Sequence, residues 1–305
     1  GVKDGGIAIL VGTHAVIQEE LAFHRLGLAV VDEQHKFGVE QRAILKQKAH
    51  SPHVMIMTAT PIPRTLALTV YGDLDVSIIK ELPKGRKPVA TYVVSEDRRD
   101  RVYGFVREEL AKGRQAYVVC PLIQTKGQEV LSEKSEVKDA TAMYDRLHRE
   151  VFPEATVGLI HGRMEVKEKE KVMKDFKKGA IQVLVSTVVI EVGIDVPNAT
   201  IMIVENAERF GLSQLHQLRG RIGRGQHESF CVLLADPQTD DAAERLKAIE
   251  ATTDGFQIAE ADLSIRGPGE FFGTRQHGLP EIRFGNIVKD IDIMERARRI
   301  AFEIV

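Results

Sequence analysis

The sequence repeats one pattern along most of its length. Short runs of β-branched and other apolar residues alternate with segments whose apolar positions recur at helical spacing. Runs without polar residues are typical of strands buried on both faces, as in a parallel sheet covered by helices. The runs are Ile7–Val11, Leu28–Val31, Val54–Met57, Tyr117–Cys120, Val157–Ile160, Ile181–Val185, Ile201–Val204 and Phe230–Leu233. Asp100–Ala111 and Glu165–Lys178 predict amphipathic helices between them. The alternation predicts an α/β fold with helices on both sides of its sheets.

Composition and charge exclude several classes of protein. Hydrophobic residues make up 43% and charged residues 28% of the chain, which excludes a disordered or collagen-like protein. The 42 Lys and Arg are balanced by 44 Asp and Glu, which excludes a uniformly basic coat but permits a local basic face. No apolar run reaches the roughly 18 residues of a membrane span. Cys120 and Cys231 lie far apart without metal-binding neighbours, so the sequence favours a reducing, cytoplasmic environment.

Two changes along the chain predict boundaries. Glu81–Pro88 holds two prolines and a glycine, which favours an interdomain linker. After Asp236 the buried-strand runs stop, and Thr239 followed by two aspartates predicts the start of a helix. Arg266–Gly269 and the region from residue 273 to 285 predict loops or turns. The last part of the chain is therefore expected to be a small helical appendage.

An acidic motif follows the second apolar run. Asp32, Glu33, Gln34 and His35 come directly after Leu28–Val31. Carboxylates at the carboxyl end of a parallel strand face the crevice where α/β sheets bind ligands. An Asp there can hold Mg²⁺, and a neighbouring Glu can activate a water molecule. An acidic pair can equally begin a helix, and the dipeptide alone favours that structural role.

Two further polar stretches follow apolar runs and leave their roles open. Thr58 and Thr60 could transmit the state of a nucleotide to a neighbouring surface, or could cap the next helix. Gly193 and Asp195 lie beyond Ile181–Val185 in an apolar setting. They could serve a sugar, a phosphate backbone or a tight turn.

The most unusual stretch is Gln214–Gly225. Arg219, Arg221 and Arg224 alternate there with three glycines within seven residues. Arginine is a planar, permanently charged donor that suits phosphate oxygens, and glycine permits close backbone approach. A solvated basic helix end is the alternative, but it needs no glycines. The stretch therefore favours a phosphate-directed role.

Together these motifs resemble those of superfamily 2 helicases, in the order DEQH, TATPIPRT, STVVIEVGIDVPNA and QLHQLRGRIGRG. The flanks Gly12–Ala15, Asp32–Gly38, Glu208–Gly225 and Asp262–Pro280 are similar to the RecG family, bacterial ATP-dependent translocases of branched DNA. The similarity covers nearly the whole chain and implies RecA-like motor domains. The transcription-repair coupling factor is the nearest alternative, but its acidic motif differs and a Tyr often replaces His216.

The resemblance implies a role for each motif. Asp32 would ligate Mg²⁺, Glu33 would be the catalytic base, and Arg221 and Arg224 would be arginine fingers. The other implied roles are nucleotide contact by Gly193, Asp195 and Gln217, coupling by Gln34, His35, Thr58 and Thr60, and DNA contact or translocation by Thr13, His14, Arg266, Arg275 and Gln276. ATP and Mg²⁺ are the implied cofactors, and the implied partner is branched DNA, such as replication forks and Holliday junctions, in recombination and repair.

The resemblance also divides the chain and indicates what it lacks. Residues 1–82 would be the back part of a first motor domain, 83–236 a second motor domain, and 237–305 a helical hairpin with a translocation segment. A helicase motor needs a GxxxxGK[ST] phosphate loop, and this sequence has no Gly-Lys dipeptide. In the family that loop and the branch-binding wedge domain lie further upstream. We therefore expect a fragment of a DNA helicase that cannot hydrolyse ATP by itself.

Two hypotheses from other functional classes have less support in the sequence. A non-enzymatic nucleic-acid-binding module built on a decayed helicase conflicts with the retained DEQH motif and arginines, since neither helps folding. A small-molecule α/β enzyme could use Asp32, Glu33 and a histidine. However, the sequence shows no nucleophile elbow, HExxH or GxGxxG to support it.

Overall fold

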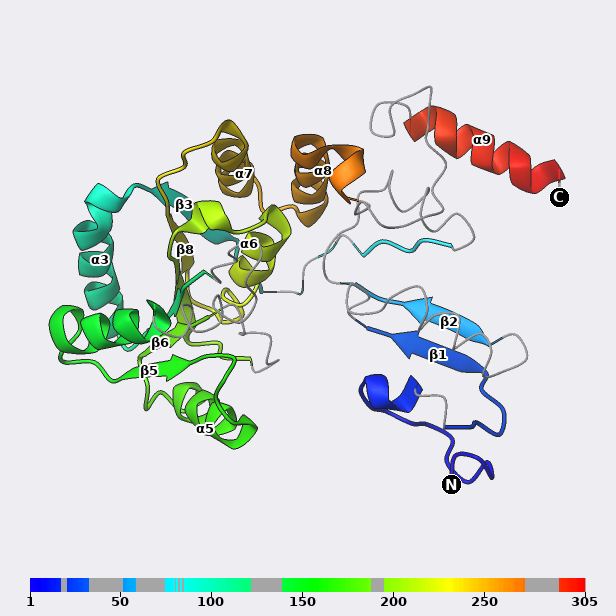
Figure 1. Cartoon of the computed structure of the whole chain (residues 1–305), viewed down its shortest axis with the longest axis horizontal. Helices are drawn as coiled ribbons and strands as arrows, with labels where there is room; N and C mark the ends of the chain where they lie inside the picture. The colour runs from blue at the N-terminus through cyan, green and yellow to red at the C-terminus, as the bar shows by residue number, and fades with distance from the viewer. Residues whose placement is uncertain are drawn as a thin grey trace. The chain divides into compact units, whose positions relative to one another are not determined.

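A computed structural model describes residues 1–17, 21–32, 52–58, 75–79, 81, 83, 85–121, 139–187, 195–271 and 291–304. The chain divides into two compact units, Gly1–Pro61 and Ile62–Val305, and Figure 1 labels many of their elements. Among the described residues, no helix has both the length and the apolar character needed to cross a membrane.

The first unit contains the 3-10 helix η1 (His14–Ile17) and the strands β1 (Leu28–Val31) and β2 (His53–Ile56). The two strands pair in parallel, as their sequences predicted, with β1 aligned residue by residue against β2. Leu28, Val30 and Met55 are exposed, however, so the prediction that these strands are buried on both faces is wrong in the described part of the unit.

The prediction that the first apolar run is a buried strand is also wrong. Ile7–Val11 forms no strand, and Ile9 and Val11 are 81% and 89% exposed. A strand satisfies its backbone N–H and C=O groups by pairing with a neighbour. No described strand pairs with this run, so its apolar composition alone does not make it a buried strand.

The second unit is built around a six-stranded parallel sheet with the order β3-β8-β7-β4-β6-β5. The strands are β3 (Val89–Val94), β4 (Gln115–Val119), β5 (Val157–Ile160), β6 (Val183–Ser186), β7 (Ala199–Val204) and β8 (Ser229–Leu234). Five of them match predicted apolar runs. The sequence missed β3, which lies at the edge of the sheet and is only partly buried. A strand that is only partly buried has no need of a continuous apolar run, and Thr91 interrupts this one.

Helices cover both faces of this sheet (Figure 1). The described helices of this unit are η3 (Glu96–Arg98), α3 (Arg99–Ala111), η4 (Leu147–Val151), α5 (Val166–Lys177), η5 (Ala207–Arg209), α6 (Leu212–Arg219), α7 (Asp240–Ala251), α8 (Gly255–Phe271) and α9 (Ile291–Ile304). One hydrophobic cluster joins α3 and η4 to the sheet, and a second joins α5, α6, α7 and α8 to it. The predicted α/β layering is confirmed.

Capping explains where two predicted helices begin. Glu165 and Glu168 form a capping box at the start of α5. The Thr239 hydroxyl accepts a hydrogen bond from the Ala242 amide at 3.3 Å at the start of α7. One turn prediction is wrong, because Arg266–Gly269 continues α8. Helix propensity is a weak local preference, and tertiary context routinely overrides it.

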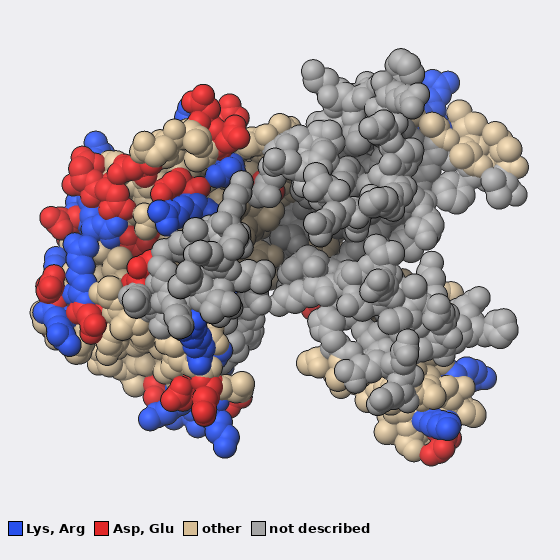
Figure 2. Space-filling view, viewed as in Figure 1, with Lys and Arg blue, Asp and Glu red and all other residues tan. Residues whose placement is uncertain are grey.

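Charges are distributed in two ways in this unit. On the surface, acidic and basic side chains are interleaved over the described face in view (Figure 2). Inside, Arg99 joins α3 to Glu205, the residue after β7, with 2.7 Å between Nη1 and Oε1. Glu205 is 1% exposed. Burial raises the pKa of Glu205, and the hydrogen bond from Arg99 opposes that shift. The guanidinium thus opposes the protonation of Glu205 that burial favours.

We predict that Arg99→Met lowers the free energy of unfolding by about 3 kcal/mol, because it leaves the Glu205 carboxylate buried without its partner. Urea unfolding of the chain measures the change. Lys112→Met is the control, since Lys112 pairs with Glu109 at the surface and should matter far less. Equal losses in the two variants would contradict the role given to the buried pair.

Candidate functional site

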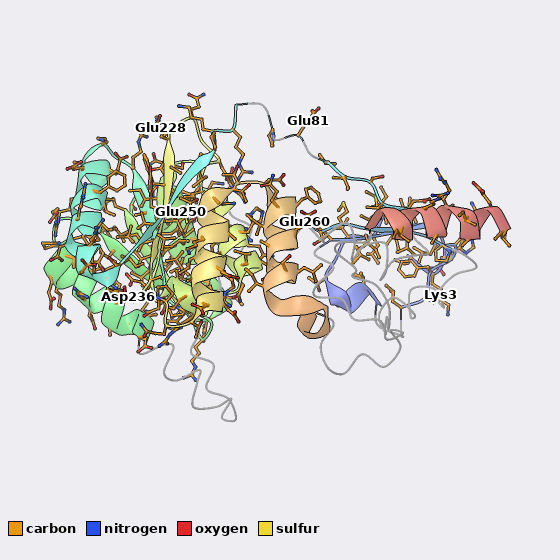
Figure 3. The ribbon with its side chains drawn as sticks, turned by 90° about the horizontal axis from the view of Figure 1, so that it is seen from above. Lys3, Glu81, Glu228, Asp236, Glu250 and Glu260 are labelled. Carbon is orange, nitrogen blue, oxygen red and sulfur yellow. The ribbon has the colours of Figure 1, made fainter. Side chains whose placement is uncertain are left out.

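Three loops meet at one edge of the six-stranded sheet. β3, β8 and β7 are neighbours in the sheet, and residues just before each of them line an open hollow of about 880 Å³. The lining residues are Pro83, Gly85, Arg86, Asp195, Pro197, Asn198, Arg224, Gly225, Gln226 and His227. Because the strands are parallel, these loops lie at the amino-terminal edge. Figure 3 labels Glu228 just before β8 and Asp236 just after it, which mark the two edges.

The loop after α6 presents Arg224 to this hollow. Arg224 forms an ion pair with Asp195, with 3.5 Å between Nη1 and Oδ1. Its Nε also donates to the Gly220 carbonyl at 3.3 Å, and Arg86 Nη2 donates to the same oxygen at 3.2 Å. The last carbonyls of a helix have no intrahelical partner, and cations near them are favourable. The end of α6 therefore gathers guanidinium groups.

A buried tyrosine lies in the electrostatic field of the same groups. Tyr117 belongs to β4, and burial raises its pKa to about 12. The positive charges of Arg221 and Arg224 oppose this shift, and Asp195 adds to it. The structure thus brings together Asp195, Arg221 and Arg224, three of the residues that sequence reasoning singled out. Guanidinium groups beside an open hollow suit a phosphate-bearing ligand.

Arg219 has a different place from its two neighbours. It is 4% exposed, and its Nη1 donates to the carbonyls of Ile249 at 2.7 Å and Thr252 at 2.9 Å. These bonds join the end of α6 to the end of α7. A phosphate-directed role for the whole arginine stretch is therefore wrong for Arg219, whose donors are used within the protein.

Two glycines allow the loop to lie close to its neighbours. A β-carbon on Gly225 would come within 2.4 Å of the Pro197 carbonyl oxygen. Gly223 has a φ of 72°, and its β-carbon would lie 2.7 Å from a methyl group of Val89. The glycines are thus needed for close backbone approach, as the sequence predicted, but the close neighbour here is the protein itself.

We predict that Gly225→Ala destabilises the chain by about 1–3 kcal/mol, because the backbone must shift to admit a methyl group. Thermal unfolding measures the loss. Gly104→Ala is the matched control, since nothing lies within 4 Å of its added β-carbon inside α3. Alanine is the better helix former there by about 1 kcal/mol, so the control should be neutral or stabilised. Two equally stable variants would show that the close approach is unimportant.

His216 lies on α6, which leads into the loop that carries Arg221 and Arg224, here called the arginine loop. Burial lowers its pKa to about 4, and the charges of Arg219 and Arg86 act in the same direction. Its Nδ1 lies 3.3 Å from Arg219 Nη2. A neutral imidazole can accept this hydrogen bond, whereas an imidazolium would face two cations.

This shift predicts a pH dependence of stability. The folded state prefers neutral His216, so its contribution is present above the ordinary pKa of 6.5 and is lost as the pH falls toward 4. The loss by pH 4 is on the order of 3 kcal/mol. Unfolding of wild type and His216→Gln between pH 7 and 4 isolates this contribution. The difference between the two curves should shrink with acid, and parallel curves would contradict it.

The predicted sites of the first unit follow its strands. Asp32 comes directly after β1, and Thr58 lies two residues beyond the end of β2. Since β1 and β2 are parallel, both lie at the carboxyl edge, as predicted. Thr13 precedes η1, and its carbonyl accepts a hydrogen bond from the Val16 amide at 3.0 Å. In the described part of the chain, no group of three or more His, Cys, Asp or Glu side chains is placed to hold a metal ion.

The other predicted site residues lie on α6 or outside the described ranges. Gln217 lies half-buried on α6. The residues outside the described ranges are Glu33, Gln34, His35, Thr60, Gly193, Arg275 and Gln276, and the side chains of His14 and Arg266 are outside them too.

Sequence reasoning missed Arg86 and Tyr117. Arg86 gave only the weak signal of one more basic residue in a predicted linker. Tyr117 gave the signal of a hydroxyl inside an apolar run. Without the strand order, the sequence does not show that either residue lies near the arginine loop.

Three family descriptions match parts of this chain. The family described as helicase conserved C-terminal domain matches residues 98–226, which include the arginine loop. DEAD/DEAH box helicase matches residues 2–69, and ATP-dependent DNA helicase RecG, domain 3, C-terminal, matches residues 252–305.

Named relatives match almost the whole chain. It is 52% identical over 301 residues to the ATP-dependent DNA helicase RecG of Bacillus subtilis, covering 99% of this chain and 43% of that protein. It is 51% identical over 304 residues to RecG of Thermotoga maritima, covering 100% of this chain and 38% of that protein. The chain thus spans less than half the length of these relatives. A solved structure of RecG bound to a three-way DNA junction has 47% identity and a TM-score of 0.70, covering 97% of this chain and 37% of that one.

Proposed function

Because this chain belongs to the RecG family of ATP-dependent DNA helicases, we propose that it is the motor part of a helicase that remodels branched DNA. Replication forks and Holliday junctions are the proposed substrates, in recombination and repair. The observation that carries the proposal is the arginine loop beside the open hollow, where Arg224 is held by exchangeable partners.

The chemistry of this loop suits phosphoryl transfer. Charge develops on the phosphoryl oxygens as the bond to the leaving group breaks, and planar guanidinium donors stabilise it. Arg224 is partly exposed, and so is Asp195, its ion-pair partner at 3.5 Å. Exposed pairs contribute little to stability, so exchanging the carboxylate for a phosphate costs little. We assign Arg221 and Arg224 the role of arginine fingers, with Asp195, Gly193 and Gln217 as further nucleotide contacts.

The first unit is proposed to supply the carboxylates for Mg²⁺ binding and catalysis, and the coupling residues. Asp32 lies at the carboxyl end of β1, where a carboxylate suits the hard Mg²⁺ ion. Mg²⁺, when bound with ATP, would supply neutralisation of the phosphate charge. Glu33 is the proposed base for the attacking water, and Gln34, His35, Thr58 and Thr60 are proposed to couple hydrolysis to movement.

The proposal includes an upstream segment. The sequence has no Gly-Lys dipeptide, whereas a helicase motor needs a phosphate loop of the form GxxxxGK[ST]. We propose that an upstream part of the full-length protein supplies this loop and the domain that recognises the branch. The 305-residue chain alone is then expected to bind ATP weakly and not to hydrolyse it.

Contacts of α7 and α8 support a transmission role for the C-terminal segment. Arg219 joins α6 to the end of α7, and Ser213 of α6 donates to Asp262 of α8 at 3.3 Å. The helix that carries the arginine loop is therefore bonded to both helices of this hairpin. We propose that the hairpin and the segment with Arg266, Arg275 and Gln276 pass the motion to DNA, together with Thr13 and His14.

We predict that Arg221→Ala and Arg224→Ala, made in the full-length protein, each lower DNA-stimulated ATP hydrolysis by about 10³-fold, because arginine fingers act on the transition state. ATP binding should weaken much less. Lysine replacements should recover little, since a point charge does not match the planar fork. Steady-state hydrolysis with forked DNA and equilibrium binding of a fluorescent nucleotide measure the two effects.

The matched control is Arg209→Ala, because Arg209 is exposed on η5 away from the hollow and should leave hydrolysis unchanged. Near-normal turnover in Arg221→Lys would show that Arg221 is only structural. DNA-stimulated hydrolysis by the 305-residue chain above that of its Asp32→Ala variant would contradict the need for an upstream segment.

A further inference from the structure

Arg86 has a contact that the roles assigned so far do not explain. It lies three residues before β3, is half-buried, and lines the hollow together with Asp195 and Arg224. Its Nη2 donates to the Gly220 carbonyl at 3.2 Å, across 134 residues of sequence. The segment that leads into β3 is therefore bonded to the loop that carries the arginine fingers.

The acceptor of this bond is shared. Arg224 Nε donates to the same Gly220 oxygen at 3.3 Å, and a carbonyl has two lone pairs. Gly220 directly follows α6, and the peptide bond that contains its carbonyl leads into Arg221. The amide of Arg221 is itself bonded to the Leu218 carbonyl at 2.9 Å. Fixing the Gly220 carbonyl thus fixes the backbone from which Arg221 projects.

The sharing matters when Arg224 changes partners. To reach a phosphate, Arg224 must leave Asp195 and withdraw its bond from Gly220. A carbonyl that loses its only donor in a partly buried place costs free energy. With Arg86 in place the oxygen keeps a charged donor throughout, so the release of Arg224 costs less.

We propose that Arg86 is a positioning residue for ATP hydrolysis, which holds the Gly220 carbonyl while Arg224 moves from Asp195 to the nucleotide. This inference rests on the proposed function. Arg86 acts through Gly220 and Arg224 and does not itself contact the reacting atoms.

The kinetic test uses the full-length protein with forked DNA. Arg86→Gln should lower kcat about tenfold, the equivalent of about 1.4 kcal/mol in the hydrolysis step, and change KM for ATP less than about twofold. Arg86→Lys should recover much of kcat, because an ammonium group can donate to the same carbonyl. Lys87→Gln is the control, since it removes a neighbouring exposed charge and should retain wild-type kinetics. An unchanged kcat in Arg86→Gln, or a higher KM with kcat intact, overturns the inference.

A second test does not depend on activity. Amide hydrogen exchange in the 305-residue chain should be about tenfold faster at Arg221 and Ile222 in Arg86→Gln, while the amides of α3 remain unchanged. Unchanged exchange at Arg221 and Ile222 overturns the inference. If the wild-type full-length protein hydrolyses no ATP with DNA, the proposed function fails, and the exchange result alone decides the role of Arg86 in fixing the loop.

Discussion

All six strands of the second unit run in the same direction, and this constraint determines where its chemistry lies. Parallel neighbours cannot be joined by tight turns, so each connection returns across a face of the sheet, usually as a helix. The segments that precede β3, β7 and β8 therefore collect at one edge, although they are far apart in the sequence. Helices on both faces bury the central strands in two hydrophobic clusters, which hold that edge in place. The hollow is a direct consequence of the strand order.

The loop at this edge combines a fixed backbone with exchangeable side-chain partners. Arg219 is buried and bonded to two carbonyls at the end of α7, so it fixes the base of the loop. Gly225 lies against Pro197 without room for a β-carbon, so it fixes the far side. Arg224, by contrast, is held within the described part of the chain by a partly exposed ion pair and by a bond to a carbonyl that Arg86 also binds. Such an arrangement places a guanidinium accurately and still lets it exchange a carboxylate for a phosphate.

Much of the fold could be predicted because a strand buried on both faces needs a continuous apolar run. β3 escaped prediction because Thr91 interrupts its apolar residues and the strand is only partly buried. The strand predicted at Ile7–Val11 was wrong because an apolar composition does not supply a pairing partner. The phosphate-directed arginines could be proposed from their spacing, but Arg219 could not be separated from Arg221 without its contacts to α7. Arg86 could not be found, since its role depends on β3 lying beside β8. Local patterns encode elements, whereas the site depends on which loops the sheet brings together.

The central claim is that Arg224 exchanges Asp195 for a nucleotide phosphate while the loop backbone stays fixed. A structure of the full-length protein with a non-hydrolysable ATP analogue and forked DNA tests it most directly. The account predicts a broken Arg224–Asp195 ion pair, Arg221 and Arg224 within hydrogen-bonding distance of the terminal phosphate, and Arg86 still bonded to the Gly220 carbonyl. Arg224 still paired with Asp195 in the nucleotide-bound state, with neither arginine near a phosphate, would contradict it.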